Sequence, residues 1–287
     1  MGPLIITSLK DTPVEHLHKA FLLAFDDYEI SVSLTLDALS LMLRTRDIDL
    51  ERSVGCFVDN RIVGFMLCGY RNDAKEKGQW YDGATAVIPE FRSQKIASKL
   101  IESVLQQVDE KNEEFLLEVL EHNEKARALY ERFGFIVQRT FDCYEIPVQA
   151  VSSTPAVSHA LVHDPGILYS VDIRQFDLYR PSWQNDIRSI YNARETYRFV
   201  GLLDSQELVA YGFVGVEKGD IPQIGILPSW RNDQTVRMIC TQLKSLTNAK
   251  KMILLNVERA SSLAPWLIGC GFTCFISQYE MVRTSRF

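Results

Sequence analysis

The chain has 287 residues, which corresponds to roughly two domains of the usual size of about 150 residues. Its composition, 46% hydrophobic and 24% charged, is that of a folded globular protein and excludes a disordered or collagen-like chain. Residues 1–147 carry 17 Lys and Arg against 25 Asp and Glu, whereas residues 148–287 carry 14 against 12. An acidic first half repels phosphate backbones, so we expect no nucleic acid partner and favour cationic or amine-bearing partners.

Other whole classes of protein are disfavoured by simple patterns. No apolar run approaches the roughly 18 to 20 residues that cross a bilayer, and the N-terminus has no signal-peptide pattern. We therefore expect a cytoplasmic protein with no membrane partner. The six cysteines form no C-x-x-C pair and the five histidines show no H-E-x-x-H spacing, which predicts reduced thiols and no metal site.

The first half predicts helices alternating with strands. Pro13 marks the start of a helix that Asp11 or Thr12 would cap, and residues 34–44 continue the helical pattern. The later elements follow in this order: a hairpin of strands 54–58 and 62–70, a strand at 80–88, a helix from 96, a strand at 115–120, a helix capped by Asn123 and ended by Gly134, and a strand from 135.

The second half repeats part of this order. Three blocks recur at nearly constant spacing: 89–92 as 228–231, 116–119 as 254–257, and 134–135 as 271–272. Repetition of this kind predicts two copies of one fold. Residues 148–166 are poor in charge and rich in turn-forming residues, so we expect domains at 1–147 and 167–287 joined by this linker.

Two segments carry a family resemblance. Residues 87–100 read VIPEFRSQKIASKL, and residues 117–135 hold Leu-Glu-Val, Asn, Ala, Leu-Tyr and Gly-Phe in order. Together they resemble the GCN5-related N-acetyltransferase (GNAT) family, and the second segment looks particularly like its ribosomal-protein N-acetyltransferase branch. The resemblance covers nearly all of residues 1–147, with a degenerate version in the rest.

This resemblance implies a fold and a cosubstrate. The fold would be α/β, with two tandem domains, each a mixed, mostly antiparallel twisted sheet flanked by helices, and with splayed central parallel strands in the first. Acetyl-CoA would fill the wedge between those strands, and helix N–H groups would hold its pyrophosphate. The residues implied to bind it are Ala86, Val87, Ile88, Arg92, Ser93, Gln94, Lys95, Ile96, Ala97, Ser98, Asn123 and Tyr130. Lys95 stands where the family has a glycine, and its side chain could crowd or neutralise the pyrophosphate.

The resemblance also implies catalytic roles. Tyr130 would protonate the departing CoA sulfur and Glu118 would act as the base for the amine. The alternatives are a core tyrosine and a solvent-facing strand carboxylate. Tyr28 and Glu29 lie where the family places acceptor contacts, although an acidic surface position is the simpler interpretation, and Asp82 is similarly ambiguous.

In the second copy Asn256, Ala260 and Leu267 replace Glu118, Asn123 and Tyr130. We therefore expect a non-catalytic domain, retained for packing, for homodimer formation or to complete the acceptor cleft. The expected activity is acetyl transfer from acetyl-CoA to a primary amine of a small molecule or peptide by direct attack. A non-catalytic acyl-CoA sensor and a structural interaction protein are the alternatives, and no motif indicates the acceptor.

Overall fold

The computed structural model divides into two compact units. Unit 1 comprises Met1–Gln138 together with Glu280–Phe287, and unit 2 comprises Arg139–Tyr279. The structure describes residues 2–27, 34–72, 77–152 and 160–284. The division does not follow the ranges expected from the sequence, because residues 139–147 fall in unit 2 and residues 280–287 fall in unit 1.

Unit 1 contains the helices and strands predicted for the first half, with ends shifted by a few residues. They are α1 (Val14–Ala24), α2 (Leu36–Thr45), β2 (Val54–Val58), β3 (Arg61–Arg71), β4 (Gln79–Val87), α3 (Ile96–Lys111), β5 (Glu114–Leu120), α4 (Glu124–Arg132) and the first residues of β6 (Ile136–Pro147). Strand β1 (Ile5–Ser8) and the 3-10 helix η1 (Pro89–Phe91) were not predicted. Asn123 caps α4 and Gly134, at φ 85°, follows its end, as predicted. The cap predicted for α1 is wrong, because Pro13 itself is the N-cap and no side chain bonds there.

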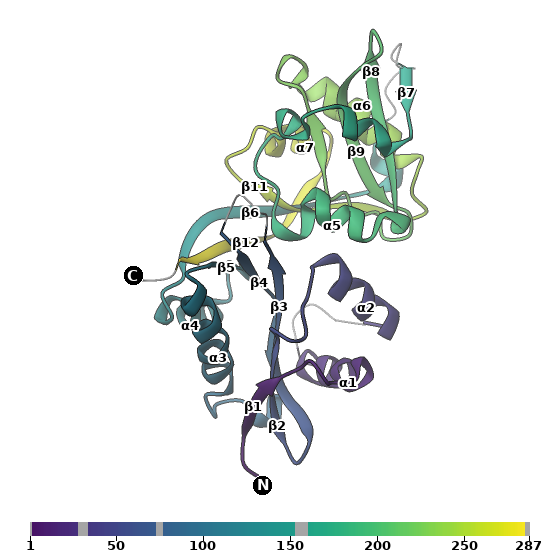
Figure 1. Ribbon diagram of the computed structural model, residues 1–287. Helices are drawn as coiled ribbons and strands as arrows, with labels where there is room; N and C mark the ends of the chain where they lie inside the picture. The colour runs from purple at the N-terminus through teal and green to yellow at the C-terminus, as the bar shows by residue number, and fades with distance from the viewer. Residues whose placement is uncertain (1, 28–33, 73–76, 153–159, 285–287) are drawn as a thin grey trace. The chain divides into compact units, whose positions relative to one another are not determined.

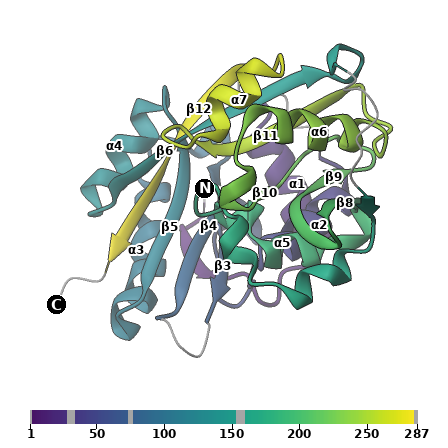
Figure 2. The ribbon, with the colours of Figure 1, turned by 90° about the horizontal axis from the view of Figure 1, so that it is seen from above.

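The strands of unit 1 form a mixed sheet with helices on both faces. Its order is β1-β2-β3-β4-β5, antiparallel except for the parallel pair β4 and β5. Helices α1 and α2 cover one face, and α3 and α4 cover the other (Figure 1, Figure 2). This is the sheet flanked by helices that the resemblance implied.

Each face buries a helix with an apolar stripe. Leu17, Ala20 and Phe21 of α1 pack with Phe65 and Leu67 of β3. On α3 the buried side chains recur at helical spacing: Ile96, Leu100, Ile101, Val104, Leu105 and Val108. Burial of large apolar side chains contributes about 1.5 to 3 kcal/mol each, so these stripes hold both helices on the sheet.

Unit 2 repeats the element order of unit 1. Its elements after β6 are η2 (Val148–Ala150), β7 (Ala160–Val162), η3 (Pro165–Ser170), η4 (Ile173–Phe176), η5 (Trp183–Asn185), α5 (Ile187–Asn192), η6 (Arg194–Thr196), β8 (Tyr197–Asp204), β9 (Glu207–Gly215), β10 (Ile224–Ile226), η7 (Pro228–Trp230), α6 (Asp233–Lys244), β11 (Lys251–Glu258), α7 (Leu263–Gly269) and β12 (Thr273–Thr284). From β8 to β12 this is the order from β2 to β6, which supports the internal repeat. Of the predicted linker, residues 153–159 lie outside the described residues.

The last strand of each repeat begins in one unit and ends in the other. From Arg139 onwards β6 lies in unit 2, where it pairs antiparallel with β11 from Phe141 to Pro147. From Glu280 onwards β12 belongs to unit 1, and β12 is the neighbour of β5 in the sheet order. Arg283 fixes this end, because its guanidinium donates to Asp109 at 2.6 and 2.9 Å and to the Phe133 carbonyl at 2.9 Å.

None of the helices in the described part of the chain combines the length and the apolar character needed to cross a membrane.

Candidate active site

The central feature of unit 1 is the parting of β4 and β5. Their parallel pairing runs from Gln79 and Glu114 to Asp82 and Leu117 and stops there, although β4 continues along β3 to Val87. The register between β3 and β4 shifts at the same point, where Gly83 is the extra residue of a β-bulge. Arg46, the residue that follows α2, stabilises the bulge, because its Nη1 donates to the Gly83 carbonyl at 2.7 Å. The predicted splay of the two strands is confirmed.

Tyr130 meets a buried carboxylate at this parting. Its hydroxyl donates to Oδ2 of Asp82 at 2.8 Å, and Thr85 donates to the same oxygen at 2.8 Å. Tyr130 and Asp82 are each only 8% exposed. The tyrosine ring is held by Phe135, with ring centroids 5.6 Å apart. The phenol hydroxyl of Tyr130 therefore has a defined position beside Asp82, the last residue of β4 that pairs with β5.

Burial raises the pKa of Asp82 to about 6, while the hydrogen bonds from Thr85 and Tyr130 act in the opposite direction. Desolvation disfavours the charged form of any carboxyl, and here it outweighs the donors. A raised carboxyl pKa of this kind is a common feature of functional sites. The sequence placed Asp82 among the acceptor contacts, but the structure places it against Tyr130.

Glu118 lies on the other face of the sheet. The hydroxyl of Tyr81 donates to Oε2 of Glu118 at 3.0 Å. Successive side chains of a strand point to opposite faces, so Tyr81 and Asp82 direct the two carboxylates to opposite sides of the parting. Burial, with the nearby Glu118 carboxylate, raises the pKa of Tyr81 well above its ordinary value, which keeps that hydroxyl a donor.

The start of α3 has the features of an anion site. Its N-cap is Lys95, in the left-handed region at φ 60° and ψ 21°, and no side chain bonds to the first turn. Ser93 is also left-handed, at φ 64°. Uncapped N–H groups at the positive end of a helix dipole attract phosphate. Lys95, at the position where the resemblance predicts a glycine, thus has a left-handed backbone of the kind that glycine favours, and it adds a charged side chain.

Arg92 has a structural task in this loop. Its Nε donates to the Val87 carbonyl at 3.1 Å, and its other nitrogens bind Asp27 at 2.5 and 2.8 Å and the Ala24 carbonyl at 3.1 Å. The guanidinium therefore fastens the end of α1 to the end of β4. The predicted role of Arg92 in cofactor binding stays a prediction, since its side chain is also 43% exposed.

The same arrangement recurs in unit 2. Arg231 donates from Nε to the Ile226 carbonyl at 3.1 Å and from Nη2 to the carbonyls of Gln175 and Asp177. Because Arg92 and Arg231 make equivalent backbone hydrogen bonds in the two copies, these bonds have a structural role. This contact is also independent support for the internal repeat, because it reproduces the spacing of five residues between donor and acceptor.

The remaining predicted cofactor residues have mixed positions. Asn123 accepts from the Ala126 N–H at 3.1 Å, so its side-chain oxygen caps α4. Ala86 and Val87 lie on the part of β4 beyond its pairing with β5, and the Ile88 N–H bonds to the Val63 carbonyl at 2.9 Å. Tyr28 and Glu29 lie outside the described residues.

Sequence reasoning missed Thr85, Tyr81 and Arg46. The signal for Asp82 was present, since it is the only acidic residue in the apolar stretch 80–88 and precedes the bulge glycine. Nothing in the sequence paired it with Tyr130, which follows 48 residues later.

The corresponding positions of unit 2 are arranged differently. Asn256 is fully buried and left-handed at φ 58°, and it bonds to Ser182 and Gln278. Leu267 is buried in an apolar core. The start of α6 is closed by its own residue, because Asn232 accepts from the Thr235 N–H at 2.9 Å. A helix N-terminus that is already capped by a side chain has fewer free backbone N–H groups to donate to a phosphate.

Comparison with known proteins agrees with this description. The family model described as acetyltransferase (GNAT) family matches residues 17–135. A sequence search of curated proteins found no match.

Solved structures match the whole chain at low identity. A tandem GNAT protein from the clavulanic acid biosynthesis pathway has a TM-score of 0.75 and 13% identity, with 99% of each chain covered. A GCN5-related N-acetyltransferase from Sphaerobacter thermophilus has a TM-score of 0.71 and 13% identity, covering 100% of this chain and 98% of that one. One from Anabaena variabilis has a TM-score of 0.64 and 15% identity, covering 98% and 73%.

Proposed function

Because residues 17–135 are an acetyltransferase domain of the GNAT family, in a chain with the fold of a tandem GNAT protein, we propose that unit 1 moves an acetyl group from acetyl-CoA to a primary amine of a small molecule or peptide. The observation that carries the proposal is the parting of β4 and β5 after Asp82 and Leu117. It brings an open strand edge, an uncapped helix start and two carboxylates to one region of unit 1.

The residues present fit acetyl-CoA as cosubstrate. The start of α3, from Ile96 to Ser98, would hold the pyrophosphate through backbone N–H groups, with Lys95 adding a positive charge. Residues 84–87 of β4 would hold the pantetheine amides by strand-like pairing on the side from which β5 has parted. When bound, acetyl-CoA would supply the activated acetyl thioester.

We assign one proton transfer to each face of the sheet at the parting. Glu118, on the face opposite Tyr130, would take the proton that the amine loses as its C–N bond forms. Tyr130 would give a proton to the sulfur as the C–S bond breaks. Both transfers are needed for neutral amide and thiol products, so the mechanism calls for one group on each side. No covalent enzyme intermediate is involved.

Asp82 would act through Tyr130 as a positioning residue. Its Oδ2 holds the phenol hydroxyl at 2.8 Å, and a carboxyl with a pKa of about 6 can return a proton to the phenol near neutral pH. The acceptor amine would then approach from the face of α1 and α2, where Glu118 lies. The acidic character of the first half favours a cationic acceptor.

The test is release of CoA thiol by the full chain supplied with acetyl-CoA and a panel of primary amines. We expect turnover with at least one amine, and a loss of at least about tenfold in kcat in Tyr130→Phe with CoA affinity nearly unchanged. Glu118→Gln should lower kcat/KM in the same assay. Tyr70→Phe is the matched control, because it removes another hydroxyl bonded to a carboxylate, Glu113, at 2.7 Å.

Two outcomes would contradict the proposal. CoA binding by calorimetry with no thiol release from any amine would indicate a sensor. Absence of CoA binding would indicate a structural interaction protein. Equal turnover in Tyr130→Phe and the native chain would remove the acid role and leave the family assignment in place.

A further inference from the structure

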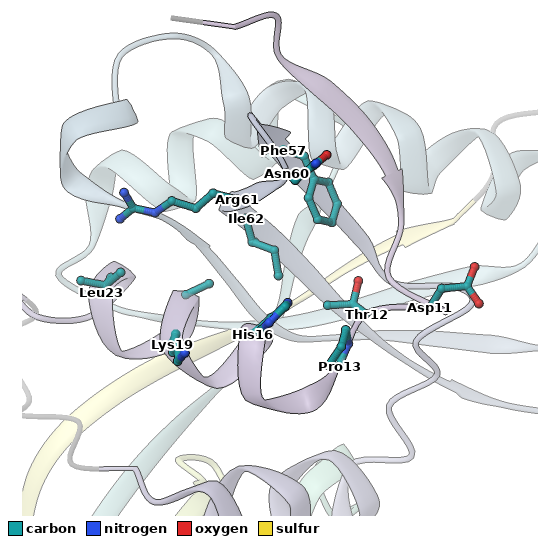
Figure 3. Close-up of a pocket in the computed structure, with 11 residues that line it drawn as sticks. Asp11, Thr12, Pro13, His16, Lys19, Leu23, Phe57, Asn60, Arg61 and Ile62 are labelled. Atoms are coloured by element: carbon teal, nitrogen blue, oxygen red, sulfur yellow. The ribbon is translucent and has the colours of Figure 1, made fainter.

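A pocket in unit 1 is lined by residues other than Asp82, Glu118 and Tyr130 at the parting of β4 and β5. It has a volume of about 520 Å³ and lies between α1 and the hairpin of β2 and β3 (Figure 3). Its lining includes none of the side chains proposed for acid–base chemistry or for holding acetyl-CoA. Helix α1 lies on the opposite face of the sheet from α3, whose start is the proposed pyrophosphate site (Figure 1). Its volume is that of a small-molecule site.

The floor of the pocket is apolar. Ala20 of α1 and Ile62 of β3 are buried, Phe57 of β2 is half-buried, and Leu23 of α1 is 43% exposed. Exposed Leu23 and half-buried Phe57 line the same pocket and favour a ligand with an apolar body, because covering these side chains removes apolar surface from water.

The lining carries two cations, Lys19 and Arg61, and one carboxylate, Asp11. Figure 3 shows Arg61 and Leu23 at one end of the pocket and Asp11 at the other. Within the described residues, neither Lys19 nor Arg61 has an ion pair or a side-chain hydrogen bond. Unpaired cations are notable in the acidic half of the chain, where carboxylates are in excess.

The hairpin turn fixes Arg61 in place. Asp59 and Asn60 both have positive φ, 47° and 62°, as in the tight turns that join antiparallel strands. Arg61 then pairs with Val58 as the first residue of β3. The backbone that presents this guanidinium is therefore already ordered before any ligand arrives.

We propose that this pocket binds a small carboxylate with an apolar, aromatic body. Arg61 and Lys19 would pair with the carboxylate, Arg61 by its planar fork, and the ring would lie over Ile62, Phe57 and Leu23. The site would be distinct from both substrates of the acetyl transfer and would allow an organic acid to act on the chain without entering the parting.

The test is titration of the full chain with naphthalene-1-carboxylate, followed by calorimetry and by backbone amide NMR shifts. We expect one site with shifts in α1 and the hairpin. Arg61→Glu and Lys19→Glu should each weaken binding at least about tenfold, since each reverses a charge that the proposal pairs with the carboxylate. Arg132→Glu, an exposed cation of α4 outside the pocket, is the matched control and should bind as the native chain does.

The neutral naphthalene-1-carboxamide should bind at least about tenfold more weakly than the acid. Equal binding of the two compounds, no binding at millimolar concentration, or displacement of the acid by saturating CoA would each overturn the proposal. CoA affinity of the variants shows that unit 1 is folded. If Arg61→Glu loses affinity for CoA, the titration is repeated with the milder variant Arg61→Gln. An Arg61→Gln variant that binds the acid as tightly as the native chain would count against the site.

Discussion

At the scale of single residues, the proposed chemistry depends on two hydrogen-bonded pairs, Tyr130 with Asp82 and Tyr81 with Glu118. Tyr130 and Glu118 could be named from the segment 117–135, and the structure places both near the parting of the strands. That Asp82 is buried and accepts from Tyr130 could not be predicted, because it depends on which face of β4 meets α4. The proposed roles of all three are predictions that kinetics must test.

The buried carboxyl of Asp82 makes stability depend on pH. Its folded pKa of about 6 exceeds the ordinary value of 3.8, so its stabilising contribution is present below pH 3.8 and is lost as the pH rises through 6. Asp82→Asn keeps an oxygen for Tyr130 and cannot ionise. We therefore expect this variant to be more stable than the native chain at pH 8, by roughly 3 kcal/mol at most.

Urea unfolding at pH 8 and at pH 4 measures this difference, which should shrink towards zero at the lower pH. A variant less stable than the native chain at both values would show that the hydrogen bonds of Asp82 outweigh its desolvation, contrary to the raised pKa.

At the scale of elements, the sequence predicted the order of helices and strands and most of their ends within a few residues. The hairpin of β2 and β3 and the cap at Asn123 followed from local chemistry. The cap of α1 did not, since Pro13 takes the N-cap position and leaves Asp11 and Thr12 outside the helix. Whether the side-chain oxygen of Asp11 or Thr12 reaches the first turn of α1 depends on the backbone conformation before the helix. The amino-acid composition does not specify that conformation.

The start of α3 gives a prediction about cofactor affinity. Lys95→Glu should weaken CoA binding, because it puts a negative charge beside the proposed pyrophosphate site. Lys95→Gly should preserve or improve it, since glycine adopts the left-handed conformation without the cost of about 1 kcal/mol that a side chain brings.

Calorimetry with CoA measures both variants. Lys99→Glu, an exposed lysine one turn further along α3, controls for net charge. Normal CoA binding by Lys95→Glu would place this side chain away from the pyrophosphate.

At the scale of the whole molecule, the repeat could be predicted and the exchange of its last strands could not. A strand's alternating pattern says which face is buried but not which neighbour it pairs with. The expected division at residue 147 therefore differs from the compact units, which divide after Gln138. The non-catalytic role of the second copy is a prediction that the capped start of α6 supports.

One consequence is the number of cofactor sites. We expect calorimetry to give one CoA per chain, because Asn232 closes the helix start in unit 2 and Leu267 stands where unit 1 has Tyr130. Two equivalent sites would contradict the non-catalytic interpretation of the second copy. Asn232→Gly is an informative variant, since it opens the helix start without restoring any other position.

Arg283 should matter for the stability of unit 1. Its three hydrogen bonds to Asp109 and Phe133 attach the last described residues of β12 to α3 and to the end of α4. Arg283→Ala leaves the Phe133 carbonyl and the Asp109 carboxylate without these donors, so we expect a loss of roughly 1 to 3 kcal/mol on urea unfolding. Arg283→Lys should recover part of it, and unchanged stability in the alanine variant would show that the strand is held by its apolar neighbours.

The crossing of β12 into unit 1 also has a consequence for synthesis on the ribosome. The residues from Glu280 that complete unit 1 are translated only after all of unit 2. While the ribosome is still adding Arg139–Tyr279, the nascent first unit has β5 as an open edge, with unpaired backbone groups that invite association with other chains. Asp82 and Glu118 are therefore synthesised early, but the sheet that carries them is completed only when the final strand emerges.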